Sequence, residues 1–176
     1  MTIREHINRR HRLRQLTRMA AVPHKKVLPP LSKVHSIGIV LPHDVSETDT
    51  QVLAFFVEHM VRRNIMVTQY RLPLADDKEN TDKWGFPSPE SLATFSSYCF
   101  DIIIAIAPND DHGTLYTVLS TPARLRIAYD DTQRLPNELG KQTFDLFIRG
   151  TGQCNTTDYL KEILTLLLHK DIHTST

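Results

Sequence analysis

Acidic and imidazole side chains gather in short segments that follow apolar runs of strand length. The candidates for chemistry are Asp44, Asp110, Asp111, Asp130 and Asp131, with His43 and His112 beside them. Carboxylate oxygens that converge at one edge of a sheet can hold Mg²⁺ and support phosphoryl transfer. Aspartate at the start of a helix or turn also has a structural use, because its oxygens accept hydrogen bonds from backbone N–H groups. We expect this structural use to dominate here.

Signals for a bound nucleotide, a metal ion or a covalent nucleophile are weak. The segment "PHDVSETD" (42–49) has no glycine, although a dinucleotide cradle or a phosphate-binding loop requires one. The nine histidines show neither HxH nor HExxH spacing, and the two cysteines are far apart. Possible nucleophiles, Ser46, Ser120 and Cys154, lack the motif that would expose them. We therefore predict no cofactor and no metal.

Two other motifs have both a functional and a structural interpretation. Gly150 and Gly152 in "RGTGQCN" could form a backbone nest for phosphate, or only a tight connection between a strand and a helix. Trp84 in "KWGFP" could be a stacking platform or a lid, or could seal the edge of the core. The structural interpretation is favoured in both cases.

The charges are strongly segregated along the chain. Residues 1–33 hold nine Lys and Arg against one Glu, whereas residues 34–176 hold twelve against nineteen acidic residues, giving net charges of +8 and −7. A helical projection of residues 3–20 spreads the arginines around the whole circumference and leaves no broad apolar stripe. We therefore expect this basic arm to lie free of the body unless an anionic partner orders it.

Four explanations of the arm are open. It could bind RNA or a ribonucleoprotein such as the ribosome, since the guanidinium fork suits phosphate. It could instead bind an acidic protein surface, either its own domain or a neighbouring copy by self-association. It could be a solubilising leader, or lie on a membrane surface, although the arm lacks the apolar face and the Trp or Phe that membrane binding favours.

The leading hypothesis is a non-catalytic α/β module that anchors to RNA or a ribonucleoprotein through residues 3–19, with Lys33 assisting. The predicted RNA-binding residues are Arg4, Arg9, Arg10, Arg12, Arg14, Arg18, Lys25 and Lys26. The alternative is a small enzyme or ligand-binding domain for a phosphorylated or nucleotide-sugar ligand. Its site would lie at the carboxyl-end rim of a sheet and would use Asp44, Asp110, Asp111 and Asp130.

The elements that must position these residues follow from hydrophobic patterning. A Pro-rich linker (20–33) separates the basic arm from a body at 34–176, so the chain divides into 1–33 and 34–176. Strands are expected at 34–41, 65–72, 99–107, 123–130 and 143–150. Helices are expected after the first three strands and after the fifth, with N-caps at Ser46 and Asn155 and a helix start at Pro89.

This alternation predicts a three-layer, Rossmann-like open parallel sheet of about five strands. The first helix is expected to bury one face made by Val52, Phe55, Phe56, His59 and Met60. The last helix repeats apolar residues at Tyr159, Leu160, Ile163, Leu164, Leu167 and Leu168.

The cellular compartment is predicted from the lack of a membrane span and of a secretory signal in the sequence. No apolar run approaches the ~20 residues that span a bilayer, and the basic start is not followed by the apolar segment of a secretory signal. Two widely spaced cysteines fit a reducing compartment. We therefore predict a cytoplasmic protein with no membrane partner.

Several stretches together resemble a known family. "IGIVLP", "KWGFPSPES", "FDIIIAIAP" and "LSTPARLRIAYD", after a basic N-terminal helix, resemble an uncharacterised bacterial family with one Rossmann-like domain behind a Lys/Arg-rich leader. The unit "YCFDIIIAIAP…LSTPARLRIAYD" is also similar to the N-terminal half of heptosyltransferase-type glycosyltransferases, with Asp101 and Ser120 matching and Ala128 replacing a usual Gly. Those enzymes bind substrate between two Rossmann halves, whereas this chain has one, so the likeness implies a shared fold.

Overall fold

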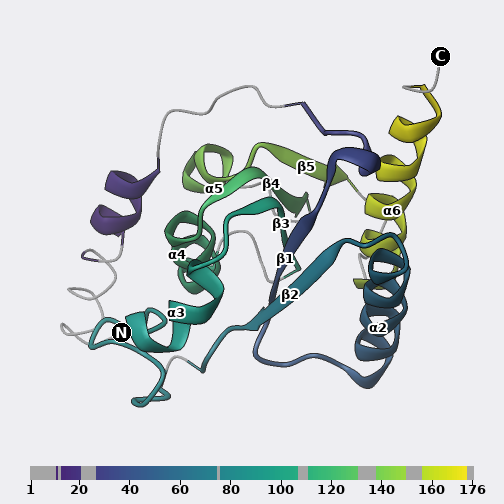
Figure 1. Ribbon diagram of the computed structural model, residues 1–176. Coiled ribbons are helices and arrows are strands. Elements are labelled where there is room, and N and C mark those ends of the chain that lie inside the picture. The colour runs from purple at the N-terminus through teal and green to yellow at the C-terminus, as the bar shows by residue number, and fades with distance from the viewer. Residues whose placement is uncertain are drawn as a thin grey trace.

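The computed structural model describes residues 11, 13–20, 27–74, 76–106, 111–130, 138–149 and 156–173, with backbone alone at 130, 138, 149, 157 and 168–173. Within these residues the chain forms one five-stranded sheet of order β2-β1-β3-β4-β5, and every neighbouring pair is parallel (Figure 1). The strands are β1 (Ser36–Leu41), β2 (Met66–Arg71), β3 (Phe100–Ala105), β4 (Ala123–Asp130) and β5 (Leu146–Arg149). The predicted Rossmann-like open sheet is confirmed.

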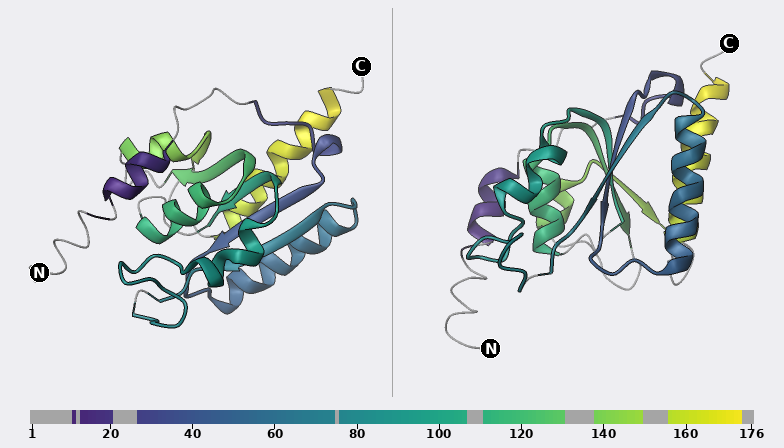
Figure 2. Two further views of the ribbon diagram at one scale, coloured as in Figure 1. Left: turned by 60° about the vertical axis from the view of Figure 1, so that its left-hand side comes forward. Right: turned by 60° about the horizontal axis from the view of Figure 1, so that its bottom comes forward.

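Helices cover both faces of the sheet, which gives the three predicted layers (Figure 2). One face carries α2 (Glu47–Val61) and α6 (Thr156–His173), with the short 3₁₀ turn η1 (Leu31–Lys33) against α6. The other face carries α3 (Pro89–Ser96), α4 (His112–Ser120) and α5 (Glu138–Thr143). β1 and β3 are buried along their whole length because both of their faces are covered.

The sheet therefore separates two hydrophobic cores. The first packs Ile37, Ile39, Ile102 and Ile104 against side chains of α2 and α6. The second packs the alternate residues of the same strands, such as Val40 and Ile103, against α3 and α4. This alternation follows from the two-residue side-chain period of a strand.

The predicted helix starts are confirmed where the structure describes them. Ser46 caps α2 by accepting a hydrogen bond from the Asp49 N–H (3.0 Å) and donating to Asp49 Oδ2 (2.7 Å). Ser88 caps α3 through the Ser91 N–H, with Pro89 at the first helical position. The predicted cap at Asn155 lies outside the described residues.

Two details of the helix prediction are wrong. The sequence pattern left the fourth and fifth strands without a helix between them, but α5 lies there; it is only six residues long and contains Gly140, a poor helix former. In α2 the buried residues are Leu53, Phe56 and Met60, whereas Phe55 is 65% exposed. α2 packs on α6 as well as on the sheet, so its buried residues depend on both neighbours and not on its apolar pattern alone.

The basic arm is not free of the body where it is described. Residues 13–19 form a helix on the outer side of the layer that contains α3, α4 and α5 (Figures 1 and 2). Leu16 is fully buried in the second core, among residues that include Phe86 and Leu115. The expectation of an undocked arm is therefore wrong for 13–19, because one well-placed leucine docks a helix that has no continuous apolar stripe.

Candidate functional site

The strand order creates a natural binding position at the carboxyl edge of the sheet. After β1 the chain returns on one side as β2, and β3 then adds on the other side of β1. The connections that leave β1 and β3 therefore run in opposite directions, which opens a crevice outside their carboxyl ends.

A cavity of about 510 Å³ occupies this position. Its walls come from the segments that follow β1, β2 and β3: Pro42, His43, Leu72, Pro73, Leu74, Asp76, Gly85, Pro87, Asp111 and Gly113. The segments after β1 and β3 were predicted at the rim from the sequence, whereas the segment after β2 was not. The signal that could have found Asp76 is the polar run "ADDKEN", which begins four residues after the end of β2.

Two of the four predicted acidic rim residues, Asp44 and Asp111, have described side chains, and of these two Asp111 lines the cavity. Asp111 caps α4, because its Oδ2 accepts hydrogen bonds from the Thr114 N–H (2.7 Å) and the Thr114 hydroxyl (3.1 Å). Asp44 is not in the wall; its side chain is 92% exposed and its Oδ2 lies 2.8 Å from His43 Nε2. Asp110, Asp131 and the side chain of Asp130 lie outside the described residues. The structural use predicted for aspartate is thus confirmed at Asp111.

The long connection from β2 to α3 is held in shape by two more aspartates. Asp77 accepts hydrogen bonds from Asn80 Nδ2 (2.8 Å) and from the backbone N–H groups of Glu79 and Asn80. The Asn80 amide is the main cause that lowers the pKa of Asp77, with the backbone N–H groups adding to it against desolvation. Asp82 accepts in the same way from the N–H groups of Trp84 and Phe86.

The connection held by these hydrogen bonds forms part of the cavity wall. Gly85, one of the lining residues, has a positive φ of 80°, which a residue with a side chain adopts only at a cost.

Trp84 joins this connection to the basic arm. Its ring stacks on His11 with a centroid distance of 3.9 Å, and Lys83 Nζ lies 5.2 Å from the ring centroid. The ring also packs against the second core, so the prediction that Trp84 seals the core edge is confirmed.

Two of the eight predicted RNA-binding residues lie in the described helix. Arg14 and Arg18 are one helical turn apart and exposed, and neither forms an ion pair with a carboxylate of the described residues. Arg4, Arg9, Arg10, Arg12, Lys25 and Lys26 lie outside the part of the chain that the structure describes.

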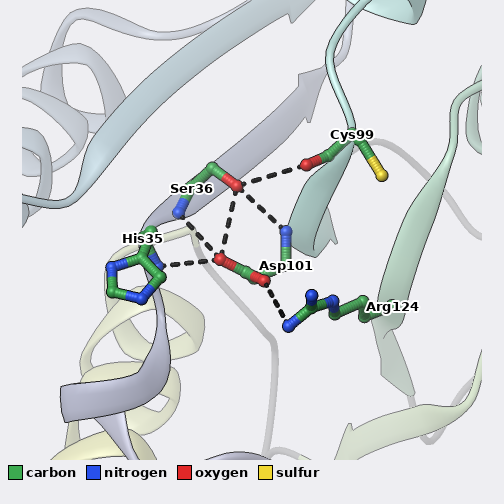
Figure 3. Close-up of polar contacts among 5 residues, drawn as sticks. All are labelled: His35, Ser36, Cys99, Asp101 and Arg124. Atoms are coloured by element: carbon green, nitrogen blue, oxygen red, sulfur yellow. Dashed lines mark hydrogen bonds and ion pairs between the residues drawn. The ribbon is translucent and has the colours of Figure 1, made fainter.

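A buried polar cluster lies at the opposite, amino edge of the sheet (Figure 3). Asp101 Oδ2 accepts hydrogen bonds from the N–H groups of His35 (2.8 Å) and Ser36 (3.2 Å), and Ser36 Oγ accepts from the Asp101 N–H (3.1 Å). Arg124, which is mostly exposed, lies 3.2 Å from Asp101 Oδ1. The carboxylate is occupied by two backbone N–H groups and by Arg124, so we assign it a structural role.

The described residues contain neither a cluster of metal ligands nor a helix that could cross a membrane. No three His, Cys, Asp or Glu side chains among them come close enough together to hold a metal ion. No helix within the same part of the chain is both long and apolar enough to span a bilayer.

No family model matches the sequence, and no curated protein matches it closely enough to count as a relative. The family resemblances suggested by the sequence thus stay predictions, and function is argued from the chain itself.

Proposed function

We propose that this protein is a non-catalytic α/β module that binds RNA or a ribonucleoprotein through a basic surface on the helix 13–19. We define this basic surface by Arg14 and Arg18 of the helix together with Lys83 of the β2–α3 connection, which contacts Trp84 as His11 does. The observation that carries the proposal is that Arg14 and Arg18 are exposed without a carboxylate partner among the described residues.

Because the helix is docked, this surface should have a higher affinity for RNA than a free arm with the same charges. Leu16 is fully buried, so the helix is already ordered and need not lose its backbone entropy on binding. Arg14 and Arg18 are spaced by four residues and lie on one side of the helix. Each guanidinium can donate two parallel hydrogen bonds to a phosphate group.

Lys83 extends the positive charge from the helix onto the body. Because Lys83 and His11 both contact the ring of Trp84, Lys83 adjoins the N-terminal end of the helix. Positive charges that lie close together on an ordered surface are typical of proteins that follow a nucleic-acid backbone.

The contacts favour an external polyanion over the acidic body as partner of the arginines. A basic segment held by the body's own charge would pair its guanidinium groups with local carboxylates. Here the described contacts that hold the helix are the burial of Leu16 and the stacking of His11 on Trp84, and the arginine charges stay unpaired.

The proposal is tested by RNA binding of the full chain at several salt concentrations, with total RNA fragments or ribosomes as the probe. Arg14→Ala/Arg18→Ala should lower the affinity, and it should reduce the slope of log K against log salt by about 1.4 to 1.8 if each arginine neutralises one phosphate. A deletion of residues 1–33 is less informative, because it also removes Leu16 and Leu31 from the cores.

The matched control is Arg63→Ala/Lys161→Ala, which removes the same charge from α6 and the end of α2, on the other face of the sheet. These two side chains are exposed and unpaired among the described residues. If both double variants lose affinity equally, binding reflects net charge and the basic surface has no special role. If RNA binds neither the wild-type protein nor the variants, the proposal is wrong.

A further inference from the structure

We propose that the cavity at the carboxyl ends of β1 and β3 binds a small organic amine in its ammonium form, with the hydrocarbon part of the molecule against the apolar wall. This site is separate from the basic surface, and the inference goes beyond RNA binding. It also differs in charge from the phosphorylated ligand that the sequence suggested for the rim.

The cavity has the size and lining of a small-molecule site. Its volume of about 510 Å³ lies within the ~300–1,000 Å³ that such sites usually have. Most of its wall is apolar, with side chains that include Leu72 and Leu74 and three prolines. Such a wall favours a ligand with a hydrocarbon body, since burial of apolar surface stabilises the complex.

The ionisable side chains of the cavity wall favour a positively charged ligand. Asp76 and Asp111 line the cavity, and Asp76 makes no hydrogen bond or ion pair with the described residues. Asp111 uses Oδ2 to cap α4, whereas its Oδ1 has no partner in the described part of the chain. The one histidine of the wall, His43, faces the carboxylate of Asp44 at 2.8 Å.

Gly113 keeps the carboxylate of Asp111 accessible. A Cβ at position 113 would lie 3.1 Å from Asp111 Oδ2 and 3.8 Å from Leu72 Cδ2, so a side chain there would fill the space between the carboxylate and the apolar wall. The glycine therefore leaves the space between the Asp111 carboxylate and Leu72 open.

An anion is disfavoured at the same place. The N-terminus of α4 would attract a phosphate through its free N–H groups, but Asp111 already occupies the Thr114 N–H and puts a negative charge there. Asp44, Glu47 and Asp49 add further negative charge at the start of α2. No Lys or Arg is among the described residues of the wall.

The test uses three probes with the same aromatic body and different charge: 2-phenylethylamine, 2-phenylethanol and 3-phenylpropionate. Each is titrated into the full-length, ¹⁵N-labelled protein, and binding is measured from amide chemical shifts of the lining residues. The amine should shift these signals at the lowest concentration, the alcohol should bind at least about tenfold more weakly, and the carboxylate should bind weakest.

The variant Asp76→Asn/Asp111→Asn should lower the affinity for the amine by at least about tenfold and leave that for the alcohol nearly unchanged. Asparagine is as good an N-cap as aspartate, so α4 should stay capped, and an unchanged melting temperature would confirm it. The control Glu90→Gln/Glu162→Gln removes two exposed charges outside the cavity and should bind the amine as the wild-type protein does.

The inference is overturned if the carboxylate binds as well as the amine, if the amine shifts no lining residue, or if the asparagine variant binds it with wild-type affinity. Failure here is distinguishable from failure of the RNA proposal. Arg14→Ala/Arg18→Ala should leave amine binding intact, and the asparagine variant should leave RNA binding intact.

Discussion

Asp101 ties the start of β3 to the residues that begin β1. Its side chain is almost buried, and its Oδ2 accepts from two consecutive backbone N–H groups, those of His35 and Ser36, before the β1–β3 ladder begins at Ile37. A buried backbone N–H such as that of Ser36 needs an acceptor, and the Asp101 carboxylate supplies one. Asp101 is one of the two residues that match the glycosyltransferase-like unit, and its described contacts belong to the framework of the fold.

We predict that Asp101→Ala lowers the free energy of unfolding by about 2–4 kcal/mol, because it leaves two backbone N–H groups without an acceptor. Asp101→Asn should cost less, since an amide oxygen can still accept. Urea unfolding followed by circular dichroism measures both values. Arg124→Ala is the matched control: its guanidinium is exposed, so its removal should change stability by less than about 1 kcal/mol. Equal losses for Asp101→Ala and Arg124→Ala would contradict the account.

At the scale of elements, Gly38 sets how closely the second core packs on β1. A Cβ at this position would lie 2.9 Å from Phe100 Cδ2 and Cε2 and 3.0 Å from Phe95 Cζ. The two rings are buried and packed on each other with centroids 5.0 Å apart, so neither has free space to move into. The missing side chain on β1 makes room for an aromatic pair supplied by α3 and the start of β3.

Gly38→Ala should therefore destabilise the fold by about 1–3 kcal/mol through overpacking, although alanine suits a strand better than glycine does. The double variant Gly38→Ala/Phe100→Leu should cost less than the sum of its single variants, because the smaller side chain relieves the clash. Chemical denaturation of all three variants gives the coupling. Additive losses would show that Gly38 and Phe100 do not meet as described.

The elements themselves were largely predictable from the sequence. Alternation of apolar runs and capped helices was sufficient for the approximate positions and the parallel direction of the strands, since parallel strands need helical crossovers. The order of the strands in the sheet was not predicted, because no local pattern records which strands pair. α5 was missed because its six residues are too few for a helical period to appear. The buried face of α2 was misassigned because Leu53 and Phe55 both fit a helical stripe, and only packing decides between them.

Only part of the candidate site could be predicted from the sequence, because tertiary packing decides which side chains line it. The cavity is built by three connections that are far apart in sequence, and no local pattern records which of their side chains converge. Asp111 could be named because it precedes a helix at a strand end. Asp44 has the same sequence context, yet its side chain points to solvent.

On the scale of the whole molecule, the N-terminal segment behaves as part of the domain. Leu16 lies 20 positions before the start of β1, yet it is buried in one core with residues of α3, α4 and the β2–α3 connection. His11 reaches the same connection by stacking on Trp84. The basic surface is thus held in a fixed place relative to the sheet, which is what allows a charged helix to present its arginines outward.

We predict that Leu16→Ala lowers the free energy of unfolding by about 2–5 kcal/mol, because it leaves a cavity in the second core. Trp84 is the sole tryptophan, so its fluorescence should report the loss of His11 stacking as well as unfolding. Leu13→Ala is the matched control from the same helix; Leu13 is 38% exposed, and its truncation should cost under about 1 kcal/mol. If Leu16→Ala matches the wild type in stability and fluorescence, the segment does not dock. The arginines would then belong to a free arm, which would have to be ordered by its partner at an entropic cost.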